Sequence, residues 1–167
     1  IEKYLIKKGV DKAEMVYSSI DINKKFKTSY NKETGESTST FIAYELTQNV
    51  TIESKKVNTV EDLSRKITEL ITQGIELSSY APRYYYTKLA DLKIEMIASA
   101  TKDARNRAQT IASNSKSALG KLKKANMGVF QITGRNSSDD YSWGGTYNTS
   151  SKLKTATITM RLTYLSE

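Results

Sequence analysis

The chain has 167 residues, a formal net charge of +8, and neither histidine nor cysteine. Without histidine there is no Ser-His-Asp or Cys-His catalytic unit and no imidazole base near neutral pH. Without cysteine there is no thiolate nucleophile, no disulfide and no sulfur-ligated zinc or iron site. No stretch approaches the ~20 apolar residues of a membrane-spanning helix. The remaining possibilities are catalysis by carboxylates, catalysis by a lysine, or no catalysis.

The positive charge is concentrated in the second half of the sequence. Residues 1–83 carry 13 basic and 12 acidic side chains, whereas residues 84–167 carry 13 basic and 6 acidic ones, a net charge of +7. Such asymmetry is typical of proteins with an anionic partner. However, 20 of the 26 basic residues are lysine, while phosphate and base recognition favour the arginine fork. A solvated lysine-rich face is therefore favoured, and binding of an anionic polymer or surface is the alternative.

The first half predicts a helix end, a long hairpin and a second helix. Residues 1–8 have the pattern of a helix that ends at Gly9. Apolar and polar residues alternate over 16–26 and again over 42–52, which predicts two strands joined by a polar loop at 28–40. Apolar residues then recur at helical spacing from residue 60, and Gly74 closes that helix.

The second half predicts one long helix and three strands. Residues 75–86 are expected to form a strand, with Pro82 at an edge or bulge because it has no N–H to donate. Residues 87–115 carry the longest helical pattern. Its apolar stripe consists of Leu89, Leu92, Met96, Ile97, Ala100, Ala104, Ala108 and Ile111. Strands are predicted at 122–133 and 155–164, the latter with the cleanest alternation.

The resulting order of elements is α-β-β-α-β-α-β-β, which predicts an α+β fold. We expect an antiparallel sheet with the helices packed on one face. Nothing in the pattern suggests an internal repeat or a linker, so residues 1–167 are interpreted as a single domain.

The loop between the last two predicted strands is the strongest candidate for a binding site. It contains two adjacent carboxylates and three aromatic residues, Asp139, Asp140, Tyr141, Trp143 and Tyr147. Such a set could bind a sugar, a cation or a protein partner. In the alternative interpretation the aromatic side chains pack on a sheet edge or on a neighbouring subunit, and the aspartates are solvated. Calcium loops space their ligands more widely than this pair.

Other residue patterns have structural explanations. The run Arg83 to Tyr86 has the composition of a base-stacking surface, but tyrosine is also a strong strand former. Glu61 and Asp62 fit the acidic start of a helix, and no spacing indicates an acid and a base held across a cleft. No lysine sits on an apolar stripe, so no lysine nucleophile is predicted. We therefore predict no catalytic residue, no cofactor and no metal site.

The succession of segments in the middle of the chain resembles the SIMPL-domain family. The segments that carry the resemblance are Tyr86 to Leu89, Ile94 to Ile97, Ala100 to Gln109, Ile111-Ala112 and Leu119 to Leu122. The Asp-Ala-Arg-x-Arg-Ala helix at 103–108 and the Leu-Gly-Lys at 119–121 are its most specific parts. The sequence departs from the family at Asn114 to Ser117, where members usually have a glycine, and lacks the family's opening strand.

The resemblance implies a bacterial cell-envelope protein, periplasmic or exported, whose relatives include a periplasmic immunogenic protein. Relatives often carry an N-terminal signal or membrane anchor, so the chain would be an N-terminally truncated SIMPL-like domain. With the opening strand restored, its first part would be a ferredoxin-like unit with α-β-β added. Some relatives form rings or channel-like oligomers, and no catalytic residues are established for the family. We therefore expect a non-enzymatic protein that acts through self-association or an envelope protein partner, with nucleic acid an unlikely ligand. Binding of an anionic polymer or membrane surface by the basic half is the alternative.

Overall fold

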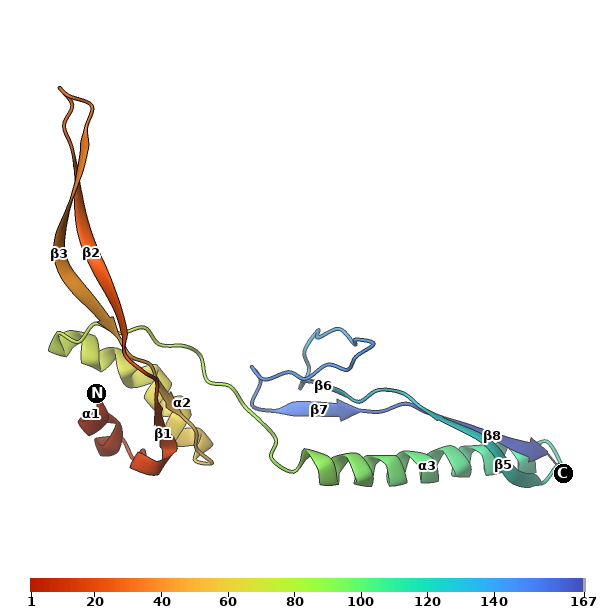
Figure 1. Ribbon diagram of the computed structural model, residues 1–167. Coiled ribbons are helices and arrows are strands. Elements are labelled where there is room, and N and C mark those ends of the chain that lie inside the picture. The colour runs from red at the N-terminus through yellow and green to blue at the C-terminus, as the bar shows by residue number, and fades with distance from the viewer. Residues whose placement is uncertain (167) are drawn as a thin grey trace. The chain divides into compact units, whose positions relative to one another are not determined.

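A computed structural model describes residues 1–166 of the chain and confirms the α+β class (Figure 1). The chain forms two compact units, Ile1–Tyr80 and Ala81–Glu167. Unit 1 contains α1 (Glu2–Lys7), η1 (Lys12–Glu14), β1 (Met15–Tyr17), β2 (Asp21–Tyr30), β3 (Ser37–Thr47), β4 (Val50–Ile52), α2 (Val57–Lys66) and η2 (Ile67–Gln73). Unit 2 contains α3 (Leu89–Asn114), β5 (Leu119–Met127), β6 (Gln131–Gly134), β7 (Lys154–Thr157) and β8 (Met160–Ser166).

The strands form four small antiparallel sheets instead of one sheet. Each sheet has two strands, which pair as β1 with β4, β2 with β3, β5 with β8 and β6 with β7. Hairpins span residues 15–52, as predicted, and 119–166, and residues outside the regular ladders at 18–20, 48–49, 128–130 and 158–159 divide each hairpin into two ladders. The elements therefore follow an order that differs from the predicted one, because each long strand is split.

The strand predicted at 75–86 is wrong. These residues belong to no ladder, although the Tyr84 N–H donates to the carbonyl of Thr149 at 2.7 Å. Pro82 offers no N–H to a partner strand, and the segment crosses the boundary between the two units. Alternation of residue types therefore marked a segment that does not form the continuous ladder of hydrogen bonds a strand requires.

The core of unit 1 is small and joins the first elements of the unit to α2. Leu5, Val10, Met15 and Leu63 are buried together, and Tyr4, Val50, Ile52 and Ile67 pack around them. The two predicted helix ends are confirmed, because Gly9 has φ +94° and Gly74 has φ +76°. Left-handed backbone at these positions lets the chain leave each helix without a Cβ clash.

The β2–β3 hairpin stands clear of α1 and α2 in unit 1 (Figure 1, orange). All residues of both strands are exposed. A two-stranded ribbon with neither face covered is marginally stable on its own in water. The hairpin is therefore the least supported part of unit 1.

Unit 2 is built on α3, which lies along β8 and β5 (Figure 1). Most of the predicted stripe faces these strands, since its members from Leu89 to Ala108 are half-buried and Ala112 is buried. Ile111 is the exception, because it is 67 % exposed. The alanines at four-residue spacing lie on one side of α3, where their small side chains allow the helix and strands to approach closely.

Candidate functional site

The loop that follows β6 is held in shape by Asp139. One carboxylate oxygen of Asp139 accepts hydrogen bonds from the Gly134 N–H and from the Asn148 amide, both at 2.8 Å. The Gly134 N–H first, and then the Ser137 and Asn148 side chains, hold the pKa of Asp139 below its ordinary value, against the opposing effect of burial. The arrangement ties the start of the loop to its end, so this carboxylate has a structural task.

A lysine closes the other end of the same loop. The Lys154 ammonium donates to the carbonyls of Asn148 and of Ser151, the latter at 2.7 Å. Burial lowers the pKa of Lys154, and the negative charge of Asp139 opposes that shift. This lysine therefore has a structural role, because its hydrogen bonds hold the two loop carbonyls together.

The remaining predicted site residues do not converge on one point. Asp140 contributes its carbonyl, which accepts from the Thr146 hydroxyl at 2.8 Å. The Tyr141 hydroxyl donates to Thr157 at 3.4 Å, while Trp143 is 100 % exposed. Tyr147 lies elsewhere, with its ring 6.3 Å from that of Tyr85. Hydrogen bonds thus fix the shape of the loop, and its Trp143 side chain is fully exposed.

Outside this loop, residues 1–166 contain no side-chain cluster with the composition of a metal site. Within residues 1–166 no cluster of three metal-ligating side chains occurs. Glu61 and Asp62 lie inside α2, and Asp62 pairs with Arg65 at 2.6 Å. Lys93 does lie on the packed face of α3, one turn from Leu89, so the expectation that no lysine sits on an apolar stripe is wrong. The sequence signal for this position was the i,i+4 spacing of Lys93 from two residues of the stripe, Leu89 and Ile97.

The β2–β3 hairpin has one apolar face and one polar face. Its ladder places Ile22 opposite Leu46 and Phe26 opposite Phe41, and the alternation of side chains adds Tyr30 and Tyr44 to the same face. The apolar face is defined by these six residues, which are 45–65 % exposed, and the same side of the ladder also carries Lys24, Thr28, Ser37 and Ser39. Ring contacts join it, with centroids 6.0 Å apart for Phe26 and Phe41 and 5.0 Å apart for Phe41 and Tyr44.

The opposite face of the hairpin is polar. It carries Asp21, Asn23, Lys25, Lys27, Ser29, Thr38, Thr40, Ala43, Glu45 and Thr47. Lys25 and Glu45 form an ion pair on it at 3.0 Å. A ribbon with such unlike faces has the pattern of a strand pair that is covered on one side only.

Comparison with known proteins identifies the family. The model of the SIMPL family, described as protein of unknown function (DUF541), matches residues 1–163. The chain belongs to the SIMPL family. No curated protein and no solved structure matches it. In this SIMPL chain, no helix among residues 1–166 combines the length and the apolar character needed to cross a membrane.

Proposed function

We propose that this SIMPL chain is a non-enzymatic protein of the cell envelope that works by self-association through the apolar face of the β2–β3 hairpin. The observation that carries the proposal is the exposure of six apolar side chains on one face of a ribbon whose other face is polar. The periplasm-facing location rests on the resemblance to envelope proteins set out from the sequence.

The size of the apolar face suits a protein interface. Large apolar side chains bury about 150–250 Å² each, so six of them at half exposure present on the order of 500 Å². The largest apolar patch on a typical soluble monomer covers about 300–600 Å² and is often functional. Two such faces together reach about 1,000 Å², the lower range of specific interfaces.

A second copy of the chain is the partner that this surface favours. An isologous contact needs a patch that is complementary to itself. Across a twofold axis the Phe26 and Phe41 rings of one copy meet the same rings of the other, and aromatic pairs stabilise such contacts by about 0.5–1.5 kcal/mol each. Lys24 lies on the same face beside Tyr44, where its stem covers apolar surface while its ammonium reaches water.

A pair of neighbouring residues on opposite faces tests the proposal. We expect Phe41→Asp to place a charge in the interface and yield a monomer, while Thr40→Asp adds the same charge to the polar face and leaves the assembly intact. Light scattering after size-exclusion chromatography gives the masses, and far-UV circular dichroism checks that both variants retain their strands. Equal masses for the two variants, or a monomeric parent chain, would contradict the proposal.

The β5–β8 ribbon supports a second candidate function, binding of an anionic polymer or surface. Its strands carry Lys121, Lys123, Lys124 and Arg161 and no carboxylate. The three lysines are exposed. Counterion release makes such binding fall steeply as salt increases. Binding to DNA or anionic vesicles that is flat with salt, or absent at low salt, would contradict this candidate.

A further inference from the structure

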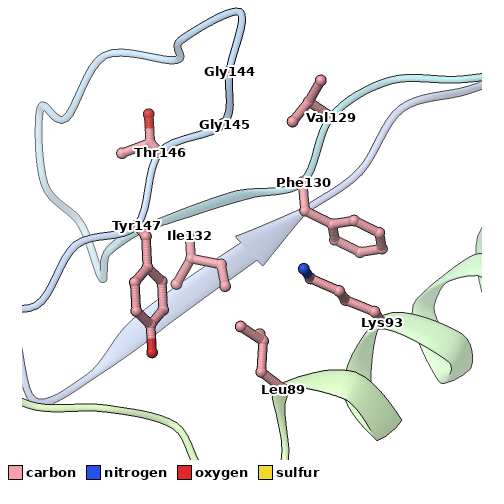
Figure 2. A pocket seen from close by; sticks show the side chains of 9 residues that line it. All are labelled: Leu89, Lys93, Val129, Phe130, Ile132, Gly144, Gly145, Thr146 and Tyr147. Atoms are coloured by element: carbon pink, nitrogen blue, oxygen red, sulfur yellow. The ribbon is translucent and has the colours of Figure 1, made fainter.

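A small cavity in unit 2 lies between the start of α3, strand β6 and the loop after it (Figure 2). Its volume is about 200 Å³. Polar and apolar groups contribute about equally to the walls, and the apolar side chains among them are Leu89, Val129, Phe130, Ile132 and Tyr147. Ile132, which is only 5 % exposed, forms the buried part of the lining.

The loop wall of the cavity is fixed by hydrogen bonds. The side-chain oxygen of Gln131, which is buried, accepts from the Thr146 N–H at 2.8 Å. Backbone hydrogen bonds join the Ile132 N–H to the Thr146 carbonyl at 2.7 Å and the Asn148 N–H to the Ile132 carbonyl at 2.8 Å. These contacts hold Tyr147 beside Ile132, so the wall is formed before any ligand binds.

Gly145 brings the loop close enough to complete the wall. It has φ +92°, and a Cβ built there would lie 2.8 Å from the Phe130 carbonyl oxygen and 2.9 Å from a Val129 methyl. Only glycine fits such an approach without a shift of the backbone. The adjacent Gly144 also lines the cavity, but a Cβ there would meet nothing within 4 Å.

One cationic side chain, that of Lys93, faces the apolar side chains of the cavity. The Lys93 ammonium lies 5.6 Å from the centre of the Phe130 ring and points into the space between Phe130, Ile132 and Leu89 (Figure 2). Lys93 is half-buried, and no carboxylate of residues 1–166 pairs with it. An ammonium without a counter-ion can pair with an anion through charge-assisted hydrogen bonds.

We infer that this cavity binds a small monocarboxylate with a single aromatic ring, whose carboxylate pairs with Lys93 and whose ring packs among Leu89, Ile132 and Tyr147. The volume limits the ligand, because a cavity of about 150 Å³ already holds benzene and drug-sized ligands need about 300 Å³ or more. The inference is independent of the self-association through the hairpin, since it uses unit 2 alone.

The test titrates the full chain, labelled with ¹⁵N, with 3-phenylpropanoate and with its neutral amide. We expect saturable shifts of the Gly144, Gly145 and Thr146 amide resonances with the acid, in the millimolar range typical of a fragment of this size. The amide is expected to bind at least about fivefold more weakly, because it lacks the charge that pairs with Lys93. Shifts that fail to saturate by about 20 mM, or an amide that binds as well as the acid, would overturn the inference.

Two lysine variants on the same helix locate the charge. Lys93→Met keeps the apolar stem and removes the ammonium, and it should weaken 3-phenylpropanoate binding at least about fivefold. Lys102→Met removes an exposed charge of α3 that does not line the cavity, and it should leave binding unchanged. Equal losses in the two variants would assign the effect to the net charge of unit 2 and would refute the site.

Discussion

Replacement of Leu63 by alanine is expected to destabilise unit 1 strongly while leaving the stability of unit 2 unchanged. Leu63 is 5 % exposed and packs with Leu5, Val10 and Met15 in a core that contains few other side chains. Leu-to-Ala changes in cores cost about 2–5 kcal/mol, and a unit of 80 residues has only roughly 4–12 kcal/mol of stability in total. We expect a loss of about 3 kcal/mol, because the half-buried Ile67 beside the site allows partial collapse.

Urea denaturation followed by amide resonances of each unit measures this loss. For a unit of this size the slope is about 1–1.5 kcal/mol/M, so the unit 1 midpoint should fall by roughly 2 M or more. Ile71→Ala is the matched control, since Ile71 is 54 % exposed and should cost under about 1 kcal/mol. A similar loss in the two variants, or a parallel fall of the unit 2 midpoint, would refute the small separate core.

Two further predictions concern the loop of unit 2 and the response to pH. Gly145→Ala should lower the stability of unit 2 by about 1–3 kcal/mol in thermal melts because of its left-handed backbone and close neighbours, whereas Gly144→Ala should have little effect; equal losses would contradict the close approach. The pKa values of Glu2, Glu14, Glu69 and Asp139 are lowered by their hydrogen bonds, so the stability they contribute is present above their ordinary values and is lost as the pH falls through the lower folded values. The Gly134 amide shift, which reports Asp139 directly, should titrate below pH 3.8, and a midpoint above that value would contradict the hydrogen bond.

The helices were the most predictable part of the fold. The cap glycines at 9 and 74 and the stripe of α3 are local signals, and they match the structure except at the exposed Ile111. The strands were predictable in position but not in pairing. Phe26 is read correctly as a strand residue from alternation, yet nothing local shows that its ladder stays two-stranded or that residues 75–86 join no ladder.

The candidate site was only partly predictable from the sequence. Composition singled out Tyr147 and Asp139, but their tasks depend on contacts between distant residues, such as the one from Asp139 to Gly134. The cavity was missed because it depends on Gly145, whose left-handed backbone is a property of the folded loop. The pair Gly144-Gly145 was the available signal for such a close approach.

Self-association is tested most directly by the mass of the unmodified chain in solution. Sedimentation equilibrium from about 1 to 100 µM spans the affinities typical of a modest apolar interface. The proposal predicts a concentration-dependent rise from the chain mass of 18.8 kDa to at least twice that value. A constant mass of one chain across the range would contradict it.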